Sequence, residues 1–446
     1  MKSVRFECEV VTPMFLSGAD PAVAELRPPS IRGAMRFWFR AMTGLVVGGN
    51  LSALHTLEKR VFGHTESRSP FRVRISPPPE EQWKPGEHLP GGDGEALNYL
   101  SCQALFDAFG RLRRAAIKPS STFTVTFQFR DQDEHLRPVV LATFWMLSAL
   151  GALGSRTRRG FGGIAVSSEE PESSLKFSSA SSDMVPEFIQ QNLGDVFAIF
   201  REFVAREIGR VEPSRLIPEW TSLSQIGLYR SQAFGTWGEA LRQVGLSLSE
   251  FRRWRAPDYQ ALKDFIDPRK APAPVPATVR RAAFGLPMTF FYPSIERLRA
   301  AEELCRVFTD AGVDGAAALA GEIAGDRDNK SRIDRASAVC RSLTRPDLQA
   351  LFKRTQQLAT VRVRRKGADR REDRRASPLL FRVLRTTDQL YCVLALFLPT
   401  ESLLGRGGTL QITSPANGTP REVDPPDPPF GAIANYLADQ KWTRVL

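Results

Sequence analysis

The sequence predicts a mixed α+β fold whose first half follows the ferredoxin-like βαββαβ plan. Apolar and polar residues alternate in four segments of this half, which is the pattern of half-buried strands. Apolar residues at helical spacing fill two of the gaps between those segments. The chain has 446 residues, of which 42% are hydrophobic and 25% charged, the composition of a globular protein with more than one domain.

The strand signals of the first half come in the order that this plan requires. Residues 4–10 alternate apolar and charged side chains, residues 71–75 repeat the pattern, and residues 123–129 show it most clearly. Residues 164–166 add a short fourth strand. Helices are predicted for residues 31–45 with Ser30 as N-cap, for residues 51–62, and for residues 138–150 as a buried helix. Two insertions follow the first two strands, and residues 77–95 form an exposed Pro/Gly-rich loop.

A linker rich in Ser and Glu at residues 167–183 predicts a domain boundary. We therefore expect an N-terminal module at residues 1–170 and a C-terminal module with helical insertions at residues 171–446. In the second module we predict helices at 184–208, 294–308 and 332–359, a Pro-rich spacer at 268–276, and a hairpin of strands 379–384 and 390–398.

A weak internal sequence similarity is compatible with a duplication of the module. Phe-Gly at 62–63 and Ser-Pro at 69–70 precede one predicted strand, and Phe-Gly at 284–285 and Ser-Pro at 377–378 precede another.

The charge balance points to an anionic partner. Lys and Arg total 61 against 49 Asp and Glu, which gives a net charge of +12. Most of these cations are Arg, which binds phosphate with two parallel hydrogen bonds and stacks on bases, so RNA is the favoured partner. A GC-rich genome would produce the same Arg bias, and composition does not separate the two.

Cysteine and histidine patterns indicate neither a disulfide framework nor a metal site. The five Cys form no CxxC pair, which fits a reducing cytoplasm, and the four His form no metal-binding spacing. We expect no metal and no cofactor. The longest apolar run, at 139–153, is too short to span a membrane.

Four arginines surround the first predicted helix, and three of them share one of its faces. The spacing of four residues between the last three keeps them on one slanting stripe. A basic stripe can hold a sugar–phosphate backbone, or it can be a solvated face paired with carboxylates. Residues 26–57 contain no acid, which favours phosphate. The candidates are Arg27, Arg32, Arg36 and Arg40.

A glycine- and arginine-rich loop at residues 151–163, GALGSRTRRGFGG, is the second candidate. Glycines allow close approach of the backbone to a ligand, and successive amides can bind an anion. It lacks the Lys-Ser/Thr ending of a Walker loop, and its RGFG segment resembles the start of an RNP1 motif. The alternative is a helix C-cap with a tight turn. The candidate contacts are Arg156, Arg158, Arg159, Gly160 and Gly162, with Phe161 as a stacking face.

Two weaker candidates remain. Residues 361–375 carry a local net charge of +5, typical of a solvated run that could order on RNA or on a partner. His55 and His64 lie near basic residues and could act as general bases in a ribonuclease, although each is also an ordinary surface residue.

Residues 11–42 resemble the N-terminal signature of a known family, the RAMP-superfamily subunits that come first in the Cmr module of type III-B CRISPR effectors. The loop LGSRTRRGFGG is similar to the glycine-rich loop of that superfamily. The residues that carry the signature are Pro13, Phe15, Gly18, Ala19, Arg27, Pro28, Ser30, Ile31, Gly33, Arg36, Trp38 and Arg40.

The resemblance implies two ferredoxin-like, RRM-like RAMP modules with helical insertions. It further implies a non-catalytic, RNA-binding subunit of a cytoplasmic ribonucleoprotein complex for antiviral defence, located at the 3′ end of the crRNA and assisting capture of target RNA. Its partners would be crRNA, target RNA and other RAMP subunits, with no membrane. Two alternatives stay open: a RAMP endoribonuclease that processes crRNA with a His general base, and a structural cap whose basic patches bind acidic subunits.

Overall fold

The chain forms two compact units whose segments are interleaved in the sequence. The computed structural model describes residues 2–48, 50–90, 97, 99–100, 105–107, 110–167, 173–209, 211, 222–253, 256–270, 276–284, 288–325, 344–367, 377–399, 409–416, 419–426 and 430–446. Unit 1 comprises Met1–Phe251, Pro378–Ser402 and Pro428–Leu446. Unit 2 comprises Arg252–Ser377 and Leu403–Asp427, so the chain leaves unit 1 and returns to it twice.

The first sheet of unit 1 confirms the four strands predicted for the first half. These are β1 (Lys2–Val10), β2 (Phe71–Ser76), β5 (Thr122–Phe129) and β6 (Ile164–Val166), in the order β2-β5-β1-β6 with every pair antiparallel. The register places Val4 and Val73 on either side of Phe127, so the apolar residues of three strands face the same side.

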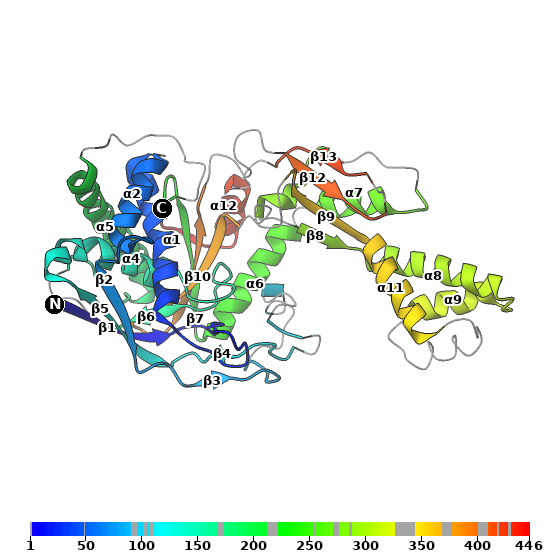
Figure 1. Cartoon of the computed structure of the whole chain (residues 1–446), viewed down its shortest axis with the longest axis horizontal. Helices are drawn as coiled ribbons and strands as arrows, with labels where there is room; N and C mark the ends of the chain where they lie inside the picture. The colour runs from blue at the N-terminus through cyan, green and yellow to red at the C-terminus, as the bar shows by residue number, and fades with distance from the viewer. Residues whose placement is uncertain are drawn as a thin grey trace. The chain divides into compact units, whose positions relative to one another are not determined.

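Four helices cover that apolar face (Figure 1). They are α1 (Pro28–Val47), α2 (Leu51–Phe62), α4 (Arg137–Leu150) and α5 (Val185–Ile208), all of which were expected. Helix α4 is apolar on every side because it packs against the sheet, α1 and α5. The ring of Phe144 on α4 lies 5.0 Å from that of Phe127, at the centre of the core.

Some boundaries differ from the expectation. Helix α1 begins at Pro28, two residues before the predicted N-cap Ser30, because prolines at its first two positions have the φ angle that a helix needs. Short strands β3 (Gln82–Trp83) and β4 (Ala116–Ile117) pair with each other, so the predicted loop 77–95 is partly ordered. The 3₁₀ helices η2 (Asp131–Leu136) and η3 (Ser182–Met184) precede α4 and α5.

The second sheet of unit 1 repeats the strand order of the first. It contains β7 (Gly227–Phe234), β10 (Leu379–Arg385), β11 (Tyr391–Phe397) and β14 (Thr443–Arg444), in the order β10-β11-β7-β14. Helix α6 (Trp237–Arg253) follows its first strand, and α12 (Phe430–Asp439) precedes its fourth. In both sheets the second and third strands along the chain are neighbours, and the first lies between the third and the fourth. Strands β10 and β11 form the expected hairpin.

The second sheet lies between the first module and its own helices, which explains why β11 is apolar throughout. Leu380, Leu394 and Leu396 belong to the same hydrophobic core as the first sheet and α4. On the opposite side, Phe251 of α6 stacks on Phe381 with ring centroids 6.3 Å apart. A strand covered on both faces has no position for a polar side chain exposed to water.

Unit 2 contains a third sheet and a group of helices. Strands β8 (Met288–Phe291), β9 (Thr360–Arg365), β12 (Leu410–Thr413) and β13 (Arg421–Val423) pair in the order β13-β12-β9-β8. Helix α7 (Ala256–Ile266) packs on this sheet. The 3₁₀ helix η4 (Arg280–Phe284), which follows α7 in the sequence, contributes to the same core. Helices α8 (Pro293–Asp310), α9 (Ala316–Gly325) and α11 (Arg345–Leu358) share a separate core around Leu304 and Phe308.

Two expectations for unit 2 change. The predicted helix 332–359 begins at Arg345 within the described residues, and its part before 344 lies outside them. The basic run 361–375 begins as strand β9, with Val361 and Val363 buried, because its residues alternate at the period of a strand. Residues 368–375 of that run, like residues 271–275 of the Pro-rich spacer, lie outside the described residues.

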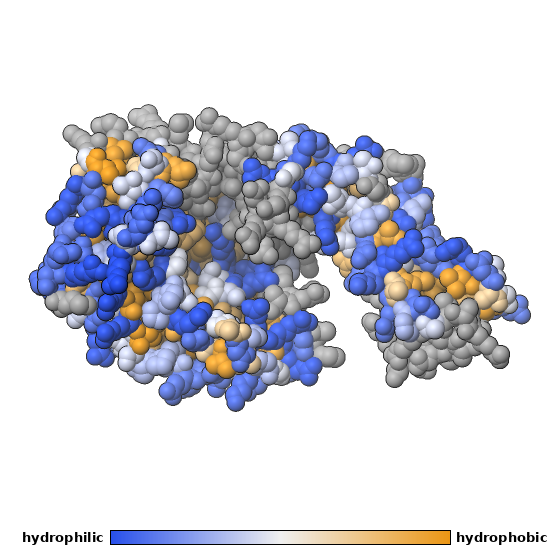
Figure 2. Space-filling view, in the orientation of Figure 1, coloured by the Kyte–Doolittle hydropathy of each residue, from blue (hydrophilic) through white to orange (hydrophobic). Residues whose placement is uncertain are grey.

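The surface of the described residues is mainly hydrophilic on the face shown in Figure 2, with apolar residues in scattered groups. Among the described helices, none is both long enough and apolar enough to cross a lipid bilayer.

Candidate nucleic-acid interface

The arginine stripe on α1 is hydrogen-bonded to the C-terminal end of α2. The Arg32 Nη2 atom donates to the carbonyl oxygen of Phe62 at 2.9 Å, and Arg36 donates to the carbonyls of Phe62 and Gly63 at 3.4 and 3.3 Å. These carbonyls end α2, where the helix dipole is negative and intrahelical donors run out. The Arg32 guanidinium also lies 5.4 Å from the ring centroid of Phe71. Two of the predicted RNA contacts therefore cap the C-terminus of α2.

Arg40 has a carboxylate partner that the sequence pattern did not reveal. Glu58 of α2 accepts from Arg40 Nε and Nη2 at 2.5 and 2.6 Å, and the Nε atom of Arg36 lies 3.8 Å from it. The hydrogen bond with Glu58 raises the pKa of Arg40. Burial, and then the nearby charge of Arg36, lower the pKa of Arg32. The stripe lacks acids in sequence, but the fold places Glu58 beside it.

The outer edge of the stripe stays open to solvent. The side chains of Arg27, Arg36 and Arg40 are 47%, 39% and 51% exposed. Arg27 occupies the N-cap position of α1 with an extended backbone, and its Nε atom lies 3.7 Å from Glu25. Gly33 lies between them on the exposed side of α1, and an added Cβ there would meet nothing within 4 Å. This edge combines accessible guanidiniums with bare helix backbone.

The glycine- and arginine-rich loop is held in place by the segment that follows β1. The hydroxyl of Thr12 donates to the carbonyl of Gly160 at 2.8 Å and accepts from the amide of Gly163 at 3.0 Å. The amide of Gly162 donates to the carbonyl of Pro13 at 3.0 Å. These bonds satisfy buried backbone groups that a loop would otherwise leave unpaired. The loop is thus a fixed part of the core of unit 1.

Two glycines of this loop are required by the packing of the chain. Gly160 and Gly162 have φ angles of 85° and 74°, which side chains rarely adopt. A Cβ on Gly160 would lie 2.9 Å from Leu241 of α6, and one on Gly162 would overlap the carbonyl of Leu153. We expected these glycines to admit a ligand, but the groups that approach them belong to the protein.

Phe161 does not offer a stacking face, contrary to the expectation. Its side chain is 0% exposed, and its ring packs edge-to-face against Phe15 at 5.5 Å. The turn that Gly160 and Gly162 allow directs this side chain into the core, where burial of a large apolar ring is favourable. The sequence motif resembles an RNA-binding loop, but its aromatic residue is structural.

The three arginines of the loop have different surroundings. The Arg158 guanidinium lies 5.2 Å from the ring centroid of Phe37 on α1, and burial lowers its pKa. Arg159 donates to the carbonyl of Leu100 at 2.7 Å and forms a parallel bridge with Phe381 of β10. Arg156 has a positive φ angle of 62° and is partly exposed.

The structure joins the two predicted patches at the contact between Phe37 and Arg158. Sequence reasoning missed Phe37, because the neighbouring Trp38 and Phe39 form the buried stripe and gave the helix its orientation. It also missed Thr12, which carries no motif of its own. The resulting interface runs from Arg27 along the open side of α1 to the arginine loop.

A buried arginine, also missed, connects the two sheets behind this interface. Arg382 of β10 is 1% exposed and donates to the carbonyls of Ser148, Ile164 and Val383 at 2.8, 2.6 and 2.6 Å. Burial lowers its pKa to about 9. Ser148 lies in the last turn of α4 and Ile164 in β6, so one guanidinium serves a helix end and a sheet edge. No sequence signal marks it apart from a charge in an apolar strand.

The histidines singled out in the sequence are not brought together in one cavity. His64 lines a pocket at the end of α2, whereas His55 is an exposed residue of α2 and does not line it. Within the described ranges, no three His, Cys, Asp or Glu side chains gather as a metal-binding group.

The sequence matches the RAMP superfamily over residues 7–165, which include the end of β1, the stripe and the arginine loop. Two Pyrococcus furiosus proteins are similar to it. The CRISPR system Cmr subunit Cmr1-2 is 30% identical over 179 residues, which are 36% of this chain and 93% of the relative. The subunit Cmr1-1 is 29% identical over 265 residues, which are 58% of this chain and 74% of the relative.

The fold is similar to a solved structure as well. The crystal structure of Cmr1 from Pyrococcus furiosus aligns with a TM-score of 0.54 and 19% identity, covering 100% of this chain and 99% of that one. The chain therefore belongs to the RAMP superfamily and, within it, to the Cmr1 family of CRISPR system subunits.

Proposed function

We propose that this chain is a non-catalytic, RNA-binding subunit of a type III-B Cmr complex. It would bind at the 3′ end of the crRNA and assist the capture of target RNA, together with other RAMP subunits. The observation that carries the proposal is the coincidence of the family match at 7–165 with an accessible basic edge on α1. Exposed guanidiniums there can contact phosphates without reading base sequence.

The arrangement of strands supports the two-module part of the proposal. The two sheets of unit 1 have equivalent strand order and equivalent helix positions, which is what two ferredoxin-like modules in one chain would have. The Ser-Pro pairs at 69–70 and 377–378 precede β2 and β10, the second strand of each sheet. The Phe-Gly pairs do not correspond in the same way, because Phe62 ends α2 in unit 1 whereas Phe284 lies in unit 2. The boundary near residue 170 stays a proposal.

The arginines proposed to contact RNA are those whose side chains are accessible to solvent. Arg27, Arg36 and Arg40 present accessible guanidiniums, and Arg156 is partly accessible on the loop. Arg32, Arg158 and Arg159 hold the surface in shape through carbonyl and aromatic contacts. A reversal of charge at Arg158 or Arg159 would disturb the fold as well as any bound RNA, so it is a poor test.

Gly33 allows a sharper test of the interface. Because its Cβ position is open, Gly33→Ala adds an uncharged side chain there and should raise helix stability slightly. Gly33→Glu places a carboxylate next to Arg36, three residues along the helix, and on the same face as Arg40. We expect Gly33→Glu to weaken binding of a single-stranded RNA at least tenfold by fluorescence anisotropy, with Gly33→Ala close to the parent protein. Equal affinities for the two variants would rule out this face.

The salt dependence of RNA affinity is an independent test of the same interaction. Contacts to phosphates release counterions, so the logarithm of the association constant should fall linearly as the logarithm of salt concentration rises. Gly33→Glu should flatten that line relative to Gly33→Ala. A binding constant insensitive to salt would contradict phosphate recognition.

The position at the crRNA 3′ end is tested in the assembled complex. A crRNA carrying 4-thiouridine near its 3′ end should crosslink to this subunit, and the same label near the 5′ end should not. Crosslinks only to other subunits would favour a structural cap. Metal-independent cleavage of repeat RNA that His64→Ala abolishes would favour the endoribonuclease instead.

A further inference from the structure

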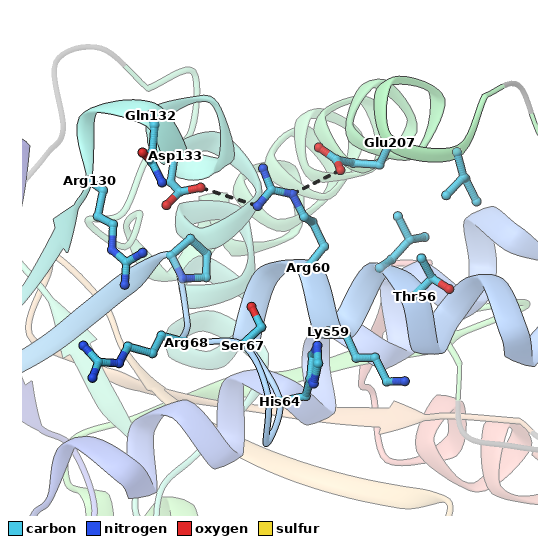
Figure 3. Close-up of a pocket in the computed structure, with 13 residues that line it drawn as sticks. Thr56, Lys59, Arg60, His64, Ser67, Arg68, Arg130, Gln132, Asp133 and Glu207 are labelled. Atoms are coloured by element: carbon cyan, nitrogen blue, oxygen red, sulfur yellow. Dashed lines mark hydrogen bonds and ion pairs between the residues drawn. The ribbon is translucent and has the colours of Figure 1, made fainter.

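A cavity of about 390 Å³ opens on unit 1 at the end of α2, apart from the contacts that join α1 to α2 (Figure 3). Its walls come from the last turns of α2, the loop that leads to β2, the start of η2 and the end of α5. The volume falls within the range of pockets that hold small ligands, roughly 300–1,000 Å³. It is large enough for one nucleotide and too small for a folded partner.

One wall of the cavity is an ion cluster built around Arg60. Arg60 Nη1 lies 3.4 Å from Asp133, and its Nε atom lies 3.3 Å from Glu207 (Figure 3). Its Nη2 atom also lies 3.1 Å from the His135 ring. Both carboxylates are paired with Arg60, and one guanidinium against two carboxylates leaves this cluster with a net charge of −1.

The rim of the cavity carries cations that the protein does not balance. Lys59, Arg68 and Arg130 are exposed, and among the described residues none of them has an ion-pair partner. They come from three separate segments and line the same cavity, with Arg68 and Arg130 on one side and Lys59 on the other (Figure 3). With Arg60, the lining carries four cations against the two carboxylates, so its net positive charge would attract an anion.

We propose that this cavity binds the phosphate and ribose of a nucleotide. Arg68 and Arg130 would hold the phosphate, because two guanidiniums on the same side of the cavity supply its oxygens with charged donors. Lys59, on the other side, adds to the positive charge of the cavity. Thr56, Ser67 and Gln132 line the same space and can bond to sugar hydroxyls. The described lining contains no Phe, Tyr or Trp, and its aromatic ring is the imidazole of His64, so recognition would rest on the phosphate and the ribose more than on the identity of the base.

This inference rests on the proposed function for the source of the ligand, namely a phosphate at the end of an RNA strand. A free mononucleotide offers the same phosphate and ribose. Titration calorimetry of the full chain with adenosine 5′-monophosphate, adenosine 3′-monophosphate and adenosine measures the shared chemistry. Short single-stranded RNAs with a 5′-phosphate, with a 3′-phosphate or with hydroxyl ends then identify the source.

We expect a phosphate-bearing probe to bind at least tenfold more tightly than its dephosphorylated counterpart. The double variant Arg68→Glu with Arg130→Glu should abolish this preference. Arg206→Glu, which reverses one charge, is the control for a change outside the cavity, because Arg206 is an exposed residue of α5 next to Glu207 and does not line the cavity. It should leave each affinity within twofold of the parent. Thermal unfolding of both variants should match the parent, since the mutated side chains are exposed.

The outcomes separate this inference from the proposed function. Preference for an RNA with a terminal phosphate supports an RNA end as ligand, and binding of mononucleotides alone supports the cavity with a free ligand. If no probe distinguishes phosphate from hydroxyl, or if Arg206→Glu weakens binding as much as the double variant, the cavity assignment is overturned. RNA binding that still responds to Gly33→Glu would then leave the proposed function standing.

Discussion

Single residues of unit 1 show how its polar groups serve the fold and the interface together. Thr12 is 0% exposed, and its one hydroxyl satisfies two backbone groups of the arginine loop. Arg382 satisfies three carbonyls, one on α4, one on β6 and one on β10. Thr12 holds the loop that carries Arg156 and Arg158 directly, and Arg382 bonds to Ser148 and Ile164, which lie just before and just after that loop.

Thr12→Val should lower the free energy of unfolding by about 2 kcal/mol, because it leaves a buried donor and a buried acceptor without partners. The shape of the side chain is nearly unchanged, so the loss of stability measures the contribution of the hydroxyl group. Chemical denaturation measures it, and Thr12→Ser, which keeps the hydroxyl, is the control. If the Val and Ser variants are equally stable, the hydroxyl does not hold the loop.

Arg382→Met should cost on the order of 3 kcal/mol, since three carbonyls lose a charged donor while the burial of a charge is relieved. Arg382→Lys keeps the charge but not the planar fork that reaches three acceptors, so an intermediate loss is expected. Thermal unfolding of both variants and of the parent protein ranks their stabilities. A Met variant as stable as the parent would show that desolvation cancels the three bonds.

At the scale of elements, the hairpin turn between β10 and β11 is tied to the start of α5. Asp388 in that turn accepts from the amide and the hydroxyl of Ser182 in η3, at 3.0 and 2.7 Å. The hydrogen bond from Thr386, followed by those from Ser182, lowers the pKa of Asp388 to about 2. The second sheet and the long helix α5 are thus connected through one carboxylate.

This connection predicts a pH dependence. The folded pKa lies below the ordinary value of about 3.9, so the stabilisation is complete above that value and is lost as pH falls through about 2. Denaturation midpoints of the parent and of Asp388→Asn, measured between pH 2 and pH 6, should differ most at the upper end and converge at the lower end. A constant difference would mean that the carboxylate does not titrate with folding.

The elements that the sequence predicts are those with long, regular patterns. β1, β5, α1, α2 and α4 follow from clear periods, and α5 and the β10–β11 hairpin do so in the second half. β7 and β9 carry Arg residues, β8, β12, β13 and β14 are short, and such segments resemble loops until partner strands are known.

For the interface, sequence reasoning found the arginines but not their partners. Glu58 lies 18 residues from Arg40 in the chain and comes beside it only when α1 and α2 pack. The burial of Phe161 depends in the same way on Phe15 and on the turn around it. Local patterns report which residues can bind phosphate, and the tertiary fold decides which of them remain available.

On the scale of the whole molecule, the two sheets of unit 1 share a hydrophobic core. Residues of both sheets belong to it, including Leu380 and Leu394 from β10 and β11. A fragment that ends near residue 170 would therefore expose the apolar face that normally meets the second sheet.

We expect the fragment 1–170 to aggregate. A version of unit 1 in which short Gly/Ser linkers replace 252–377 and 403–427 should be monomeric and cooperative in unfolding. The packing of Phe251 on Phe381 supports the first of these junctions. Size-exclusion chromatography and thermal melts compare the two proteins. A soluble, cooperative 1–170 fragment would show that the first module is independent.

The interleaved path of the chain also affects the order in which the protein can fold during synthesis. The first sheet has all its strands once Val166 has been made. Strand β7 pairs only with β11 and β14, and all of Arg252–Ser377 is synthesised before either partner exists. Such non-local pairing slows folding and prolongs exposure of apolar strands to other chains. The first module can shield one side of these strands meanwhile, so its early completion would protect the nascent chain.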